Sequence, residues 1–203
     1  MIDVRWATPG DAAAVADRIE TEVRKPGAKR MAFTGGSTPL KVLALLATRD
    51  LDWSQVTIAL TDDRRVPDDH PASNYGKIHA ALGNSGAQFE RLVENAAVAP
   101  FDLVWLGMGE DGHMASLFPT MQALVRPVPT VIATTPVPLP PEAPFDRLTL
   151  NLKALKASTE IILVVTGANK RALLERALAG ADEYPVFDIL HGEGPPVTLY
   201  WSE

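Results

Sequence analysis

The chain has 203 residues, of which 46% are hydrophobic and 22% are charged. This length is typical of one compact domain, and this composition excludes a disordered chain. We therefore expect a single domain over residues 1–203. Asp and Glu outnumber Lys and Arg by 25 to 19, which gives a net charge of −6. Such an acidic chain is a poor general binder of nucleic acid, because phosphate backbones favour clustered cations.

Cysteine is absent from the chain. Its absence excludes disulfides, thiolate zinc sites, iron–sulfur clusters and cysteine nucleophiles. The N-terminus lacks the basic start and apolar stretch of a signal peptide. The longest apolar run typical of a strand, residues 161–165, is far shorter than the roughly 20 residues that span a bilayer. The sequence therefore predicts a soluble protein with no membrane partner.

Short apolar runs alternate along the chain with helical patterns, beginning with a helix. Thr8 has the character of its N-cap, and apolar residues recur at every fourth position from Val15 to Val23. Many prolines lie between residues 119 and 144, so we expect that stretch to be an irregular surface excursion outside the sheet. Further strands are predicted at Lys29–Phe33, Val56–Leu60, Leu103–Leu106, 148–150, 160–165 and 197–201, and further helices at 39–47, 75–82 and 170–179.

This alternation of strands and helices predicts an α/β sandwich with a mostly parallel sheet. Four polar segments each directly follow a predicted strand. The carboxyl ends of parallel strands share one edge, and ligands bind in the crevice there, so we expect the four segments to meet at one site. The segments are 34–39 (TGGSTP), 61–67 (TDDRRVP), 107–113 (GMGEDGH) and 166–170 (TGANK).

The first of these segments has the features of an anion-binding loop. Gly35 and Gly36 let the backbone approach a ligand, Ser37 adds a hydroxyl, and the N–H groups at the start of the next helix can cradle an anion. The plainer alternative is a tight turn, because glycine tolerates positive φ. The segment is not a Walker loop, since the lysine-serine ending is missing.

His113 is the most informative single residue. Three glycines precede it within six residues and bring the backbone close, and Asp111 is placed to orient its ring. Histidine suits a general base because its protonation changes near neutral pH. For the charged run at 62–65, its place after a buried strand favours a function over a solvated surface. No metal site is expected, because paired histidines and thiolates are both missing, and no nucleophile elbow of a serine hydrolase occurs.

These segments, in this order, resemble the 6-phosphogluconolactonase family. The resemblance covers nearly the whole chain, and its most specific block is 101–119. The matching blocks are 35–39, 62–67, His70 with 73–75, 101–119, 147–150 and Gly167 with Lys170.

The resemblance implies a Rossmann-like three-layer sandwich, which is shared with glucosamine-6-phosphate deaminases. It also implies a cytoplasmic enzyme that hydrolyses 6-phospho-D-glucono-1,5-lactone in the oxidative pentose phosphate pathway, without a cofactor. The partner implied is this small sugar-phosphate lactone.

Individual residues match the family's functional positions. His113 matches the general base, and Asp111 precedes it. Arg64 and Lys170 match the residues that hold the substrate phosphate. The remaining substrate-binding candidates are Gly35, Gly36, Ser37 and Asp62.

The chain also departs from the family's pattern. Asp63 stands where Glu is usual, which leaves its role open, and Arg65 is a second cation that could compete with Arg64 for phosphate. Two alternatives remain. One is an amino-sugar-phosphate deaminase or isomerase, although deaminases carry an acid where this chain has Phe118. The other is a non-catalytic sugar-phosphate-binding module, which would not need His113.

Overall fold

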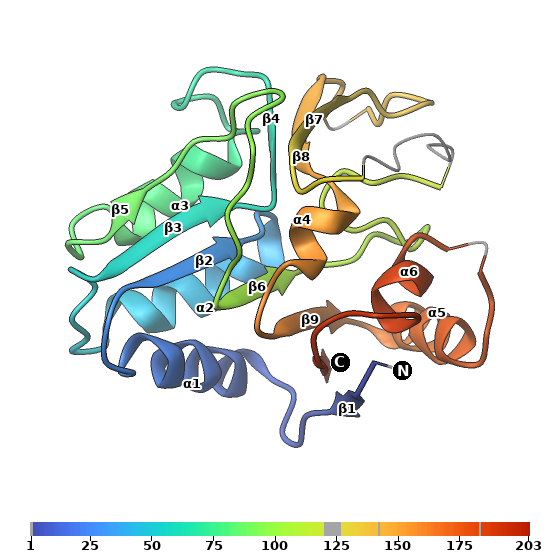
Figure 1. Ribbon diagram of the computed structural model, residues 1–203, viewed down its shortest axis with the longest axis horizontal. Coiled ribbons are helices and arrows are strands. Elements are labelled where there is room, and N and C mark those ends of the chain that lie inside the picture. Colours follow the sequence, from blue (N-terminus) through green and yellow to red (C-terminus); the bar gives the residue numbers. More distant parts are fainter. Residues whose placement is uncertain (1, 120–126, 142, 183) are drawn as a thin grey trace.

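The computed structural model describes residues 2–119, 127–141, 143–182 and 184–203 (Figure 1). Its centre is a seven-stranded sheet in the order β1-β10-β9-β6-β2-β3-β5, and the strands pair in parallel. The predicted mostly parallel sheet is confirmed. The strands are β1 (Val4–Trp6), β2 (Lys29–Phe33), β3 (Val56–Leu60), β5 (Gln88–Phe89), β6 (Leu103–Leu106), β9 (Ile161–Thr166) and β10 (Val197–Ser202).

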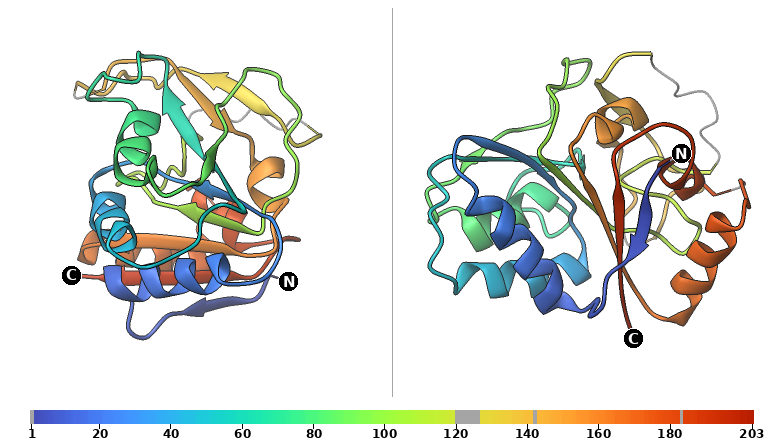
Figure 2. Two further views of the ribbon diagram at one scale, coloured as in Figure 1. Left: turned by 90° about the vertical axis from the view of Figure 1, so that its left-hand side faces the viewer. Right: turned by 60° about the horizontal axis from the view of Figure 1, so that its bottom comes forward.

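Helices cover both faces of this sheet, which gives the three layers of the predicted α/β sandwich (Figure 2). A hydrophobic core lies on each face of the sheet, and successive side chains of β6 point alternately into one and the other. Trp105 packs with the first set of helices and Leu106 with the second, so the strand is apolar on both faces. The first set is α1 (Ala12–Val23), α2 (Ser37–Ala47) and α3 (Asn74–Leu82); the second is α4 (Leu152–Lys156), α5 (Ala168–Leu178) and α6 (Val186–Leu190).

A second, antiparallel sheet has three strands in the order β4 (Asp62–Arg64), β8 (Arg147–Leu150) and β7 (Val131–Thr134). Because β4 follows β3 after one residue, this sheet begins at the carboxyl edge of the first. The expectation that residues 119–144 lie outside any sheet is therefore wrong for β7. Its residues are mostly buried and its prolines flank the strand without interrupting it. Residues 120–126 and 142 lie outside the described residues.

The start of α1 differs from the prediction as well. Asp11, not Thr8, is the N-cap, and its carboxylate accepts a hydrogen bond from the N–H of Ala14 at 2.9 Å. Gly10 lies against the backbone of Trp201, where a Cβ would collide, so the chain before Asp11 runs along β10 and the helix starts later. In the part of the chain that the structure describes, no helix is long and apolar enough to cross a membrane.

The order of the strands reverses direction between β2 and β6. From β2 the chain proceeds outward to β3 and β5, whereas from β6 it proceeds to β9 and β10 on the other side. Ligands of open α/β sheets bind at such a reversal, outside the carboxyl ends of the strands. The loops after β2 and β6 therefore lie where a ligand is expected to bind.

Candidate active site

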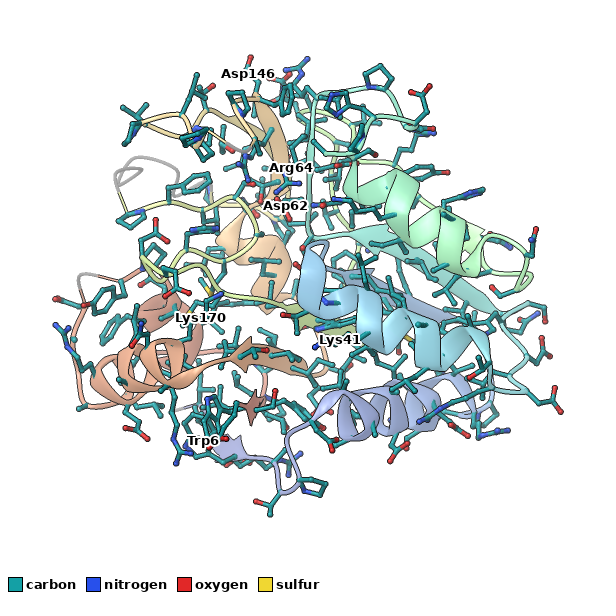
Figure 3. All side chains as sticks on the ribbon, turned by 180° about the vertical axis from the view of Figure 1, so that it is seen from behind. Trp6, Lys41, Asp62, Arg64, Asp146 and Lys170 are labelled. Atoms are coloured by element: carbon teal, nitrogen blue, oxygen red, sulfur yellow. The ribbon has the colours of Figure 1, made fainter. Side chains whose placement is uncertain are left out.

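A pocket of about 220 Å³ opens at this reversal point. All four polar segments identified in the sequence contribute to its lining, so they meet in one place. Figure 3 shows Asp62 and Arg64 together on the side of the second sheet, and Lys170 apart from them at the start of α5. The candidate residues that line the pocket are Gly35, Gly36, Asp62, Arg64, His113 and Lys170.

The loop after β2 brings backbone close to the pocket. A Cβ at Gly35 would collide with the side chain of Asn74, so only glycine fits there. Gly36 is the N-cap of α2 with a φ of 112°, and Ser37 is the first residue of that helix. Among the described residues, no side chain caps this N-terminus. Its N–H groups are therefore available to an anion.

The start of α5 repeats this arrangement on the other side of the pocket. Gly167 is the N-cap with a φ of 94°, and Lys170 lies in the first turn. The ammonium of Lys170 is 3.7 Å from a carboxylate oxygen of Glu110. Trp201 donates its indole N–H to the carbonyl of Gly167 at 3.0 Å, which ties the helix start to the last strand. A cation and a helix N-terminus thus coincide at this end.

His113 lies in a tight loop after β6. Its Nδ1 is 2.5 Å from Oδ1 of Asp111, and its ring packs on Gly109, where a Cβ would collide with it. Asp111 itself does not line the pocket but holds the ring that does. Burial raises the pKa of Asp111, but the hydrogen bond and charge of His113 together lower it by more, so the pKa is below its ordinary value. The predicted orienting role of Asp111 agrees with this contact.

Strand alternation divides the charged run at 62–65 between two surfaces. Asp62 and Arg64 line the pocket, whereas Asp63 and Arg65 line only a second groove, to which Arg64 also contributes. Arg65 pairs with Glu94 at 3.2 Å and is not placed to compete with Arg64 for a ligand in the pocket.

Asp63 has a structural position. Its carboxylate accepts backbone N–H groups from Arg64, Asn74 and Tyr75 at 2.8, 2.7 and 3.0 Å. Burial raises the pKa of Asp63, and these three bonds only partly offset that effect. Asp63 therefore joins β4 to the start of α3.

Arg147 also lines the pocket, although it is not among the site residues expected from the sequence. It stands opposite Arg64 in the pairing of β4 with β8 and is 5% exposed. The block 147–150 resembles the family, but a cation at the start of a short apolar pattern does not reveal the face that it occupies. Within the described ranges, no group of three or more His, Asp or Glu side chains is arranged to hold a metal ion.

Comparison with known proteins gives a consistent result. The family described as glucosamine-6-phosphate isomerases/6-phosphogluconolactonase matches residues 10–94 and 84–201. The 6-phosphogluconolactonase of Pseudomonas putida is 35% identical over 208 residues, which cover 92% of this chain and 85% of that protein. That of Caulobacter vibrioides is 35% identical over 216 residues, covering 95% and 92%.

Solved structures agree. A crystal structure of a 6-phosphogluconolactonase from Shewanella baltica has a TM-score of 0.79 and 30% identity, covering 100% of this chain and 98% of that one. A monomeric glucosamine-6-phosphate deaminase has a TM-score of 0.75 at 18% identity, covering 98% and 97%, which shows a shared fold alone. The chain therefore belongs to the family of glucosamine-6-phosphate isomerases and 6-phosphogluconolactonases.

Proposed function

We propose that this protein hydrolyses 6-phospho-D-glucono-1,5-lactone to 6-phospho-D-gluconate in the oxidative pentose phosphate pathway, in the cytoplasm and without a cofactor. One observation carries the proposal: His113, hydrogen-bonded to a carboxylate, lines the same pocket as Arg64 and Lys170. The relatives named 6-phosphogluconolactonase support the choice of substrate. The partner is this small lactone, and the reaction needs neither nucleic acid nor a membrane.

His113 is the general base in this proposal. A carboxylate only accepts hydrogen bonds, so Asp111 holds the proton of the neutral ring on Nδ1 and leaves the lone pair on Nε2. Nε2 takes a proton from water, and the water oxygen attacks C1 of the lactone. When the tetrahedral intermediate collapses, the bond from C1 to the ring oxygen breaks. His113 returns the proton to that oxygen, and the open-chain acid leaves.

The remaining candidates bind the substrate. Arg64 and Lys170 hold the phosphate, whose negative charge favours charge-assisted hydrogen bonds. Gly35, Gly36 and Ser37 bring backbone N–H groups to the substrate, and this role is supported by the uncapped start of α2. The last substrate-binding candidate is Asp62, which also lines the pocket.

The test is an assay of lactone hydrolysis by purified protein, measured above the spontaneous rate. A positioned base contributes about 10²–10⁴-fold, so His113→Ala is expected to lower kcat by that factor with an unchanged circular-dichroism spectrum. His79→Ala is the matched control, because His79 is an exposed histidine on α3. Wild-type protein that does not exceed the spontaneous rate would refute the proposal. A folded His113→Ala variant with normal kcat would refute the assignment of the base.

A further inference from the structure

We propose that Arg147 and Arg64 together bind an oxyanion of the ligand, which makes Arg147 a further substrate-binding residue. The proposal rests on the lactone hydrolysis proposed above for the identity of the ligand. It adds a residue that the proposed mechanism does not use.

The pairing of two strands places the two cations side by side. Arg64 and Arg147 are directly opposite each other in the antiparallel pair formed by β4 and β8. Residues opposite each other project to the same face with Cβ atoms about 5 Å apart, and both of these line the pocket. Like charges in this position destabilise a sheet. The arrangement is therefore unfavourable unless an anion joins it.

Burial makes the position of Arg147 more costly still. The residue is 5% exposed, and its buried Nε has no hydrogen-bond partner among the described residues; the same holds for the buried Nε of Arg64. The hydrogen bond from Nη2 of Arg147 to the carbonyl of Ala143, the one that it makes within the described residues, is long at 3.4 Å. Burial and, to a smaller extent, repulsion from Arg64 lower the pKa of Arg147. The attraction of Asp62 acts in the other direction but is weaker. A buried cation with unused donors is stabilised by any oxyanion that enters the pocket.

The nearby carboxylates leave these donors unused. Asp62 attracts Arg147, but in the described part of the chain its Oδ2 accepts a hydrogen bond from Ser116, and no hydrogen bond or ion pair joins it to either arginine. Asp63 faces away and is engaged with three backbone N–H groups. Arg64 donates through Nη1 to the carbonyl of Ala72 at 2.9 Å and to Oδ1 of Asn74 at 3.4 Å. Its Nε and that of Arg147 have no partner among the described residues and remain available to the ligand.

Either end of the ligand could supply the oxyanion, and both ends would bind through the same chemistry. Guanidinium groups bind phosphate and carboxylate oxygens through paired hydrogen bonds. The ligand offers such oxygens on its phosphate, and at C1 once hydrolysis has formed a carboxylate. Arg147 is also close to the base, because Phe118 contacts both: its ring centroid is 5.3 Å from the guanidinium of Arg147 and 4.7 Å from the ring of His113.

Ligand binding to the folded protein tests the proposal. The variants are Arg147→Met, which keeps the bulk without the charge, and Arg65→Met as a matched control, because Arg65 lies outside the pocket. The probes are 6-phosphogluconate, glucitol 6-phosphate, which carries only the phosphate, and gluconate, which carries only the carboxylate. Calorimetric titration gives the dissociation constants, and thermal unfolding is followed with and without each probe.

The expected result has two parts. Arg147→Met weakens binding of 6-phosphogluconate by about 10- to 150-fold, the range for a charge-assisted hydrogen bond, whereas Arg65→Met does not. Without a ligand, Arg147→Met unfolds at the same temperature as wild type or above it, because it removes a buried, unpaired charge. If Arg147 had a purely structural role, the variant would unfold at a lower temperature and its affinity for the probe would be unchanged. Loss of binding seen with glucitol 6-phosphate assigns the phosphate to the site, and loss seen with gluconate assigns the C1 carboxylate.

The proposal is overturned if Arg147→Met binds 6-phosphogluconate as tightly as wild type. If that variant does not fold, Arg147→Lys replaces it. This substitution keeps the charge but loses the fork of donors, so a folded Arg147→Lys protein with wild-type affinity also overturns the proposal. The outcome is independent of the proposed activity. If the protein binds the probes through Arg147 but does not hydrolyse the lactone, the oxyanion site is supported and the proposed activity is refuted.

Discussion

The hydroxyl of Ser116 donates a hydrogen bond of 2.6 Å to Oδ2 of Asp62, and both residues are buried. Ser116 lies in the loop that carries His113, and Asp62 begins the strand that carries Arg64. The backbone N–H of Ser116 also donates to Oγ1 of Thr149 in β8, at 3.2 Å. One residue therefore ties the loop of the proposed base to two strands of the second sheet.

We expect Ser116→Ala to reduce both stability and turnover. The substitution leaves an oxygen of a buried carboxylate without its partner, which costs about 1–3 kcal/mol in the free energy of unfolding. It also frees the loop that positions His113, so kcat should fall about tenfold or more. Urea denaturation and steady-state kinetics measure the two effects. Ser158→Ala is the control, because Ser158 donates to the carbonyl of Leu155 at the end of α4 and does not line the pocket. An unchanged kcat would limit the bond to a role in the fold.

The layers of the main sheet could be predicted because their signals are local. Continuous apolar strands such as Leu103–Leu106 are buried on both faces, and the polar segments after them had to share one edge. The second sheet could not be predicted in the same way. Its strand β4 has only three residues, all charged, and it pairs with residues more than eighty positions later, as in Asp62 opposite Thr149. The face that Arg147 occupies depends on that long-range register.

The pair of Asp111 and His113 predicts a dependence of stability on pH. The pKa of Asp111 is lowered in the folded protein, where the effects of His113 outweigh that of burial. A lowered acid pKa stabilises the fold above the ordinary value, and this contribution is lost as the pH falls through the folded pKa. The difference in the free energy of unfolding between wild type and Asp111→Asn should shrink as the pH falls from about 5 to below about 4.

Urea denaturation across this pH range measures that difference. The control is the same comparison in a His113→Gln background, where the dependence should disappear because its cause has been removed. A difference that stays constant down to about pH 3 in the wild-type background would contradict the inferred coupling.

Arg64→Met and Lys170→Met should each weaken the use of the phosphorylated lactone. A lost charge-assisted hydrogen bond of about 1.5–3 kcal/mol corresponds to roughly 10- to 150-fold in kcat/KM. Unphosphorylated gluconolactone should be a poor substrate that is insensitive to both changes, and Arg65→Met should leave both substrates unaffected. The two cations reach the site from β4 and from α5 (Figure 3), so the two variants test the phosphate-binding role from two separate elements. Equal losses on both lactones would place the residue at the carbonyl.

The family includes a second chemistry, the release of ammonia from amino-sugar phosphates, and Phe118 argues against it here. That chemistry opens a sugar ring and moves protons between carbons, so it needs several acid–base groups. Phe118 stands where the resembling block of the deaminases has an acid. Its ring packs 4.7 Å from that of His113 and can neither donate nor accept a proton. Lactone hydrolysis needs one activated water and one returned proton, which His113 can manage alone. We expect no ammonia from glucosamine 6-phosphate by a preparation that hydrolyses the lactone, with both assays run on the same protein. Ammonia release at a rate comparable with lactone hydrolysis would show that another group supplies the missing acid, and the proposed function would then be wrong.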